Sequence, residues 1–203
     1  PNLTTPKMTS AAFTTTATAS TAGSTVTSTL GAHAKTSMSL VAYRDAEPVT
    51  TALASVIRAA SADLTTPATT ITEDDTTVVS YWSNKTPSNT GWTVPANVTE
   101  RDASVGTGSG HITAAIGDTV VATGDWPGAT ATSTVAIAKG IAWTILVPPA
   151  LGVEASFRTA ASSNSNISTR SVVVPGSVQT GDQLVLVVTA NKATTIGTPA
   201  GWT

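Results

Sequence analysis

Short runs of β-branched and apolar residues alternate with turn-forming residues along most of the chain. Runs of this length, bounded by Gly, Pro, Asn or Asp, are typical of β-strands. The runs that we predict as strands are Thr25–Leu30, Met38–Tyr43, Thr76–Trp82, Ile112–Ile116, Ala131–Ile137, Ala142–Val147, Ser171–Val174 and Gln183–Thr189. Their regular spacing favours an all-β sandwich or barrel over units that alternate strands with helices.

Two of these runs also indicate how their strands are buried. In Thr130–Val135 small hydroxyl residues occupy alternate positions, which predicts a strand with one face in water. Leu184–Val188 is apolar throughout, so we expect a central strand that is covered on both faces.

One stretch has a different period. Val49, Leu53, Val56, Ile57 and Ala60 recur at steps of three and four residues, the spacing of an amphipathic helix. The threonines in the stretch disfavour a helix. A short helix between two domains is therefore one of two open interpretations.

The chain contains an internal repeat. Asp75–Lys85 matches Asp182–Lys192 with the Asn-Lys pair in register, 107 residues apart, and Gly-Trp-Thr follows in both copies. Thr25–Val41 matches Thr130–Leu146 at a spacing of 105 residues. Three matches at nearly one spacing indicate two copies of one structural unit.

The order of the matches predicts how the two copies are divided. One copy is contiguous and occupies residues 44–150, whereas the other is split between residues 1–43 and residues 151–203. An isolated half-sandwich would expose an apolar face and unpaired strand edges. We therefore expect two related antiparallel, jelly-roll-like β-sandwich domains, the second of them discontinuous and formed from both chain ends.

The composition narrows the possible partners. Only 11% of the 203 residues are charged, so hydroxyl groups must supply much of the polar surface. The formal net charge is −2, and the ten basic residues are scattered along the sequence, which disfavours a nucleic-acid partner. No apolar run approaches the ~18 residues that span a bilayer, so no membrane partner is expected.

No arrangement of residues predicts catalysis, a metal or a cofactor. The chain has no cysteine, and His33 and His111 have no acidic or histidine neighbour at a ligand spacing. The acidic cluster 73–75 precedes a strand and is best explained by a tight turn rather than a calcium site. The glycine-rich segment 106–110 lacks the Lys-Ser/Thr and the helix of a phosphate-binding loop, and we expect a hairpin loop.

The tryptophans are the remaining candidates for recognition. Trp92 and Trp202 occupy matching positions in the two copies, which favours the same packing role in each. Trp126 lies between Asp125 and Pro127 and has no counterpart, so we expect an exposed contact there. Tyr81 and Trp82 must point to opposite faces of one strand, and whether one of them faces outward is open. Trp126, Tyr81 and Trp82 form the candidate contact surface.

Three segments carry a resemblance to a known module. They are Val172–Asn191, with its Gly-Asp-Gln-Leu motif, Thr198–Thr203, with Gly-Trp-Thr, and Ser39–Arg44, with Leu-Val-Ala-Tyr-Arg. They resemble a β-sandwich module of actinobacterial secreted proteins and of virion proteins of the phages that infect those bacteria, including minor tail proteins. In that module the Gly-Asp-x-Leu strand comes first, whereas here it lies at the C-terminal end. The matching residues are framework residues, and the resemblance implies no catalytic site.

These observations predict a non-enzymatic structural component of a bacteriophage virion, such as a tail-associated, fibre or capsid-surface protein. Its expected partners are other virion subunits or copies of itself. The alternative is a carbohydrate-binding or adhesive module of a secreted, extracellular bacterial protein, with a host-surface glycan as its partner.

Overall fold

The chain folds entirely into β-strands and loops. The computed structural model describes residues 1–5, 7–57 and 59–203, and within these ranges there is no helix. Consequently, none of the described segments is a helix with the length and apolarity needed to cross a membrane. The expectation of an all-β, antiparallel sandwich class is confirmed.

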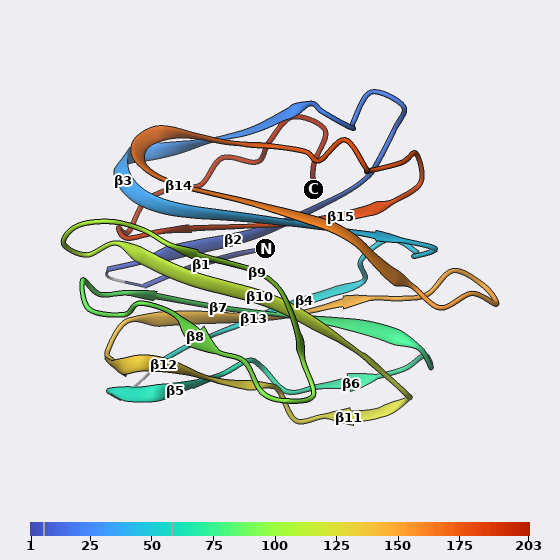
Figure 1. Cartoon of the computed structure of the whole chain (residues 1–203), viewed down its shortest axis with the longest axis horizontal. Coiled ribbons are helices and arrows are strands. Elements are labelled where there is room, and N and C mark those ends of the chain that lie inside the picture. The colour runs from blue at the N-terminus through green and yellow to red at the C-terminus, as the bar shows by residue number, and fades with distance from the viewer. Residues whose placement is uncertain (6, 58) are drawn as a thin grey trace.

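Two five-stranded antiparallel sheets form the centre of the molecule (Figure 1). The split sheet contains both chain ends, and its strands in spatial order are β1 (Asn2–Thr4), β2 (Thr9–Thr16), β15 (Gln183–Ala190), β3 (Thr25–Arg44) and β14 (Ser156–Val173). The continuous sheet comes from the middle of the chain, and its strands in spatial order are β4 (Thr51–Val56), β13 (Gly140–Val147), β7 (Thr76–Lys85), β10 (Ile112–Val121) and β9 (Thr99–Val105).

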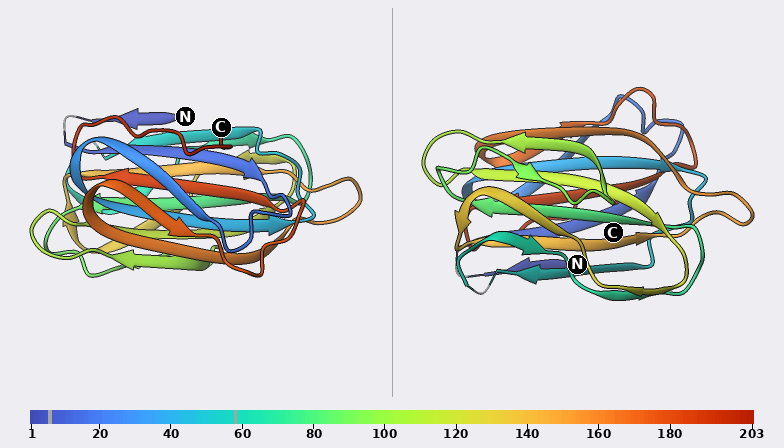
Figure 2. Two further views of the ribbon diagram at one scale, coloured as in Figure 1. Left: turned by 90° about the horizontal axis from the view of Figure 1, so that it is seen from above. Right: turned by 60° about the horizontal axis from the view of Figure 1, so that its bottom comes forward.

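Each sheet is covered on its outer face, so that the molecule has four layers (Figures 1 and 2). Two small sheets cover the continuous sheet: β5 (Ser61–Thr65), β12 (Thr130–Ile137) and β8 (Trp92–Thr93) form one, and β11 (Gly124–Trp126) and β6 (Thr69–Ile71) form the other. The split sheet is covered by the first part of β3 and the last part of β14, which pair with each other and fold back over it.

Three apolar cores separate the four layers. The first outer core lies between the split sheet and its cover, the middle core between the two large sheets, and the second outer core between the continuous sheet and its covers. Strand β15 shows the pattern most clearly, because Leu184 and Leu186 point into the first outer core while Val185 and Val187 point into the middle core. The expectation that Leu184–Val188 is covered on both faces is confirmed.

The internal repeat is visible in the strand pairing. Val79 of β7 pairs with Ile145 of β13. The repeat matches Val79 to Leu186 and Ile145 to Leu40, and these two residues also pair, in β15 and β3. Tyr81 and Trp143 pair in the same way, and their counterparts are Val188 and Met38. The two large sheets therefore have the same strand order and register. The matched residues face different cores, because Val79 and Ile145 point into the middle core whereas Leu186 and Leu40 point into the first outer core.

The two chain ends meet in the split sheet. Strand β15 lies between β2 and β3, and the backbone of Thr203 forms hydrogen bonds of 2.9 and 3.0 Å with that of Thr14. The amide of Ala12 donates to the carbonyl of Pro1 at 3.0 Å. Because the middle core contains residues from both copies, the halves of the chain are packed into one body. Their division into two domains stays a prediction.

The helical interpretation of residues 49–60 is wrong. Residues 51–56 form the edge strand β4, which pairs with β13 through six residue pairs, from Thr51 with Leu146 to Val56 with Ile141. Ala52, Ala54 and Val56 alternate toward the middle core, a period of two that the three- and four-residue spacing obscured. Residue 58 lies outside the described residues.

Candidate functional site

The three residues of the candidate contact surface are buried. Tyr81 lies in the middle core, where its hydroxyl donates to Thr189 Oγ1 at 3.0 Å. Trp82 lies in the second outer core and donates from Nε1 to the carbonyl of Ala129 at 3.2 Å. Trp126 is only 6% exposed, because β11 pairs with β6 and turns this side chain inward while Asp125 faces solvent. The expectation of an exposed contact at Trp126 is therefore wrong.

The repeated tryptophans pack as expected. Trp92 lies in the second outer core and donates from Nε1 to the carbonyl of Thr113 at 3.2 Å. Trp202 packs against the first outer core, so each of the two tryptophans packs on an outer core of the molecule. More generally, none of the five tryptophans, two tyrosines and two phenylalanines is an exposed side chain, and only Trp202 and Phe157 are partly exposed.

The histidines do not form a site. His111 is 6% exposed, and its ring nitrogens face two backbone carbonyls, those of Gly108 at 2.9 Å and Asn89 at 3.3 Å. His33 is exposed on the bend of β3. Within the described part of the chain, no three His, Cys, Asp or Glu side chains are grouped as metal ligands would be.

The acidic cluster 73–75 forms the expected tight turn. Asp75 has a positive φ of 59°, a conformation that Asp tolerates in turns. Asp74 Oδ1 accepts a hydrogen bond of 2.7 Å from the amide of Thr123, and this bond lowers the pKa of the Asp74 carboxyl. The turn thereby ties the start of β7 to the end of β10.

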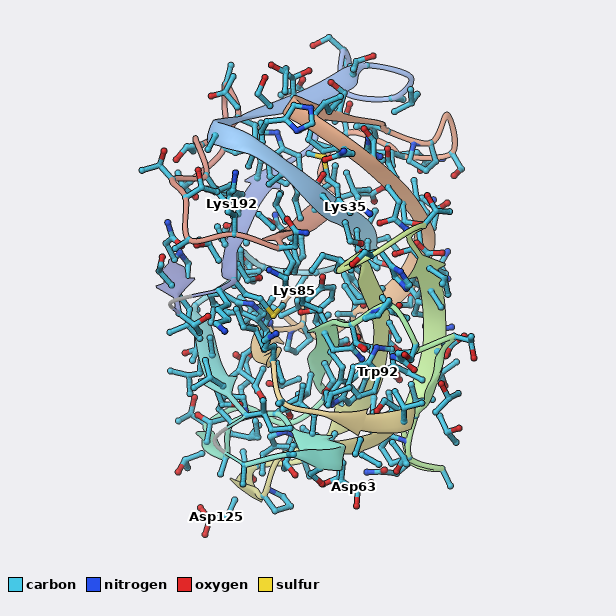
Figure 3. All side chains as sticks on the ribbon, turned by 90° about the vertical axis from the view of Figure 1, so that its left-hand side faces the viewer. Lys35, Asp63, Lys85, Trp92, Asp125 and Lys192 are labelled. Carbon is cyan, nitrogen blue, oxygen red and sulfur yellow. The ribbon has the colours of Figure 1, made fainter. Side chains whose placement is uncertain are left out.

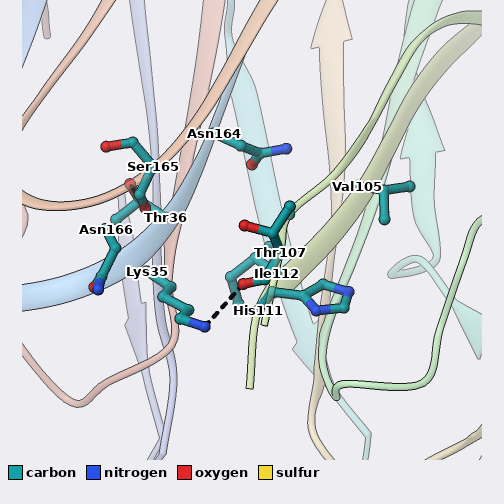
Figure 4. A pocket seen from close by; sticks show the side chains of 10 residues that line it. Lys35, Thr36, Val105, Thr107, His111, Ile112, Asn164, Ser165 and Asn166 are labelled. Carbon is teal, nitrogen blue, oxygen red and sulfur yellow. Dashed lines mark hydrogen bonds between the residues drawn. The ribbon is translucent and has the colours of Figure 1, made fainter. Parts of the chain in front are cut away.

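The glycine-rich segment 106–110 is the hairpin loop between β9 and β10, as expected. Two of its carbonyls bind a cation, because Lys35 Nζ donates to that of Thr107 at 2.8 Å (Figure 4) and to that of Ser109 at 2.9 Å. Its first amide, that of Gly106, donates to the carbonyl of Ile112 at 2.9 Å. A phosphate cradle needs converging amide donors. This loop has the opposite polarity and holds a cation.

A buried polar cluster joins the two halves of the chain. Asp118 of β10 accepts two-pronged hydrogen bonds of 2.9–3.0 Å from Arg101 and one of 2.7 Å from the hydroxyl of Tyr43 in β3. The guanidinium also lies 4.3 Å from the ring centre of Phe157 in β14. A bulge places Arg101 here, since Ile116 pairs with Asp102 and the next residue already pairs with Glu100.

The surroundings of Tyr43 change its acidity. Burial, followed by the negative charge of Asp118, raises the pKa of the Tyr43 hydroxyl well above its ordinary value. The tyrosine therefore stays a neutral donor to the carboxylate. A hollow of about 110 Å³ lies beside the cluster, which is too small for most substrates, and we assign the cluster a structural role.

All five lysines of the chain gather at one end of the molecule, which we call the lysine end. Lys35, Lys85 and Lys192 lie at this end in Figure 3, near the ends of β7 and β15 and the bend of β3. Lys7 and Lys139 lie close enough to Lys85 for their charges to act on it. Lys85 donates to the carbonyl of Asn191 at 2.6 Å, so the two Asn-Lys corners of the repeat touch. Partial burial and then three neighbouring lysines lower the pKa of Lys85. Among the described residues, no lysine takes part in an ion pair.

Sequence reasoning missed this cluster. The basic residues are scattered in sequence, but the strand topology brings the five lysines to one end, whereas Arg44 and Arg158 lie at the other. The absence of a nucleic-acid partner stays a prediction. A signal was present in the repeat, because the matched Asn84-Lys85 and Asn191-Lys192 pairs must lie at the same end of equivalent strands.

The opposite end of the molecule is acidic. Seven acidic residues lie in the loops there, namely Asp45, Glu47, Glu73, Asp74, Asp75, Glu154 and Asp182. Arg44 and Arg158 lie at this acidic end too, and they form ion pairs with Asp45 and Asp182. Among the described residues, the other five acidic residues form no ion pair. The molecule is therefore negatively charged at this end and positively charged at the lysine end.

Comparisons with known proteins add no relative, since no protein-family model, curated protein or solved structure matches the chain. The class of protein is therefore defined by the fold alone: an all-β protein with two related, covered sheets packed face to face.

Proposed function

We propose that the chain is a non-enzymatic structural component of a bacteriophage virion that acts through contacts with other subunits or with copies of itself. The observation that carries the assembly role is the position of the polar and aromatic groups. Aromatic rings, His111 and the Arg101–Asp118 pair are engaged inside the fold, whereas exposed charge of opposite sign lies at the two ends. Such a molecule can form specific contacts without carrying out chemistry.

The assignment to a virion rests on the resemblance of Val172–Asn191, Thr198–Thr203 and Ser39–Arg44 to the phage and actinobacterial module. These segments are β15 with the loop before it, the C-terminal Gly-Trp-Thr and the end of β3. They surround the first outer core and the join between the chain ends. The resemblance therefore involves the framework that any member of such a module would need.

The experiment is to localise the chain in particles. Antibodies against the purified chain are applied to purified phage whose genome encodes it, and to particles from which its coding sequence is deleted. We expect gold labelling at a fixed position on the first particles and none on the second. Intact particles that contain no copy of the chain would refute the proposal.

The carbohydrate-binding alternative predicted that Trp126 and either Tyr81 or Trp82 stack against a sugar, and all three side chains are buried. We expect a glycan array to show no binding that depends on an aromatic residue. Binding that disappears in a Trp202→Ala variant with an unchanged unfolding midpoint would favour the alternative, because Trp202 is one of the two aromatic side chains that are partly exposed.

A further inference from the structure

An exposed apolar turn lies at the acidic end. The segment from Ala150 to Val153 forms a tight turn in which Val153 donates to the carbonyl of Ala150 at 3.0 Å. Gly152 has a φ of 78°, the conformation that a type II turn needs at its third position. Leu151 stands at the second position and is 93% exposed, and Val153 is 51% exposed. We call this turn the Leu151 tip.

Acidic side chains surround the tip. The amide of Ala150 donates to the carbonyl of Asp45 at 2.8 Å, and the amide of Glu47 donates to the carbonyl of Pro148 at 2.9 Å, so the segment 45–47 braces its base. Glu154 follows the turn directly and is exposed. Three acidic residues therefore lie beside the turn that carries Leu151, and one of them, Asp45, forms an ion pair with Arg44.

The lysine end carries the complementary arrangement. A hollow of about 590 Å³ is lined by the apolar side chains of Leu3, Val56, Ile57 and Ala138, and by Lys7 and Lys139. No acidic residue is among the described residues that line it. A second hollow of about 380 Å³, beside Lys85, is also free of acidic side chains among its described lining residues. We call the hollow of about 590 Å³ the apolar hollow.

We infer that the apolar hollow receives the Leu151 tip of a second copy of this chain, with Lys7 and Lys139 facing Glu154 and Glu47. The inference rests on the proposed assembly role and names its partner. A single solvent-exposed leucine on a braced turn gains burial in the hollow, and the surrounding charges have opposite signs at the two ends. Because the two surfaces differ and lie at opposite ends, the contact is head to tail and produces open chains of subunits rather than a closed dimer.

The test is sedimentation of the purified chain over a concentration series at low and high salt. We expect the mean mass to rise continuously with concentration, and to fall when salt screens the charges. Leu151→Asp should weaken the association by at least about tenfold, since it removes the apolar contact and places an acid in the hollow. Ala138→Glu, at an exposed position of the hollow, should have a similar effect.

A mixture of the two variants distinguishes this contact from others. Each variant retains one intact surface, so Leu151→Asp and Ala138→Glu together should form a one-to-one dimer that grows no further. Val173→Asp is the matched control, because Val173 is 58% exposed, pairs with Thr25 in the cover of the split sheet, and belongs neither to the turn nor to the described lining of the hollow. Its association should equal that of the wild type. All variants must keep the urea midpoint of the wild type.

Three outcomes would overturn the inference: a wild type that stays monomeric, a dimer that Leu151→Asp does not weaken, or a monomer that binds polyphosphate through its lysine end. The last result would assign the lysines to an acidic polymer. Detection of a monomeric chain within virions would reject this contact but keep the proposed function. A protein that assembles in solution through this contact but is missing from virions would support the contact and reject the proposed function.

Discussion

At the scale of single residues, the cluster of Asp118, Arg101 and Tyr43 is the most consequential polar feature. Asp118 has a side chain that is only 5% exposed, and it accepts bonds from both halves of the chain. Removing one partner of such a pair leaves the others desolvated, which costs more than the pair contributes when intact.

Asp118→Asn should therefore lower the free energy of unfolding by about 2–4 kcal/mol, at the lower side of the range for buried pairs because Arg101 is partly exposed. Tyr43→Phe, which keeps the ion pair, should cost about 1–3 kcal/mol. Urea unfolding monitored by tryptophan fluorescence measures both. Asp125→Asn, on an exposed strand, is the control and should change stability by less than about 0.5 kcal/mol. Equal stability of Asp118→Asn and this control would contradict the structural role of the cluster.

The two buried tyrosines predict how stability depends on alkaline pH. Burial raises the pKa of Tyr81 to about 12 from 10.0, and the pKa of Tyr43 is raised also. Above pH 10 the unfolded chain loses these protons while the folded chain keeps them, so stability is fully present below pH 10 and falls as the pH rises toward 12. Urea midpoints measured across this window should decrease, and less steeply in Tyr81→Phe. A midpoint independent of alkaline pH would show that the tyrosines ionise equally in both states.

At the scale of elements, the bulge between β9 and β10 depends on a glycine. A Cβ at Gly117 would lie 2.6 Å from the carbonyl oxygen of Thr99 and 2.8 Å from Val98 Cγ1. Gly117→Ala should thus shift the bulge that places Arg101, at a cost of about 1–3 kcal/mol. Gly176→Ala is the control, since nothing lies within 4 Å of its added Cβ. Thermal unfolding compares the two, and equal midpoints would show that β9 adjusts freely.

The strands that could be predicted from the sequence are those whose own residues are apolar or alternate. Gln183–Thr189 and Ala142–Val147 are examples, and both fall within observed strands. Strand β2 could not be recognised, because its Thr, Ser and Ala residues become buried only through packing between β1 and β15. The first half of β14, rich in Ser and Asn, is an edge of the split sheet, where propensity is a weak guide.

The candidate site illustrates the same limit. Positions in sequence place Tyr81 and Trp82 on opposite faces, which is correct, but they do not show that both faces are covered. Trp126 has the neighbours of an exposed loop, and only the pairing of β11 with β6 turns it inward. The lysine end arises from strand ends that are far apart in sequence, so it depends on the topology.

At the scale of the whole molecule, the middle core couples the two copies. Trp143 in β13 donates from Nε1 to Ser10 Oγ in β2 at 2.9 Å, and Ser37 bonds Ser104 at 2.8 Å. Both contacts join residues 44–150 to the other copy. Shared apolar burial of this kind makes unfolding cooperative.

Trp143→Ala should lower stability by about 3–5 kcal/mol and should affect both sheets. Hydrogen exchange in increasing urea should show β10 and β2 losing protection together in the wild type and shifting equally in the variant. Loss of protection confined to residues 44–150 would instead show two domains that unfold independently.

The meeting of Pro1 and Thr203 at one edge of the split sheet has a consequence for fusion. When a domain whose two ends lie side by side is inserted into a surface loop of another protein, closing that loop costs little conformational entropy. The fold is therefore suited to insertion into a surface loop of a larger protein. Such an insertion would require neither a long host loop nor the loss of the hydrogen bonds that hold the two chain ends together.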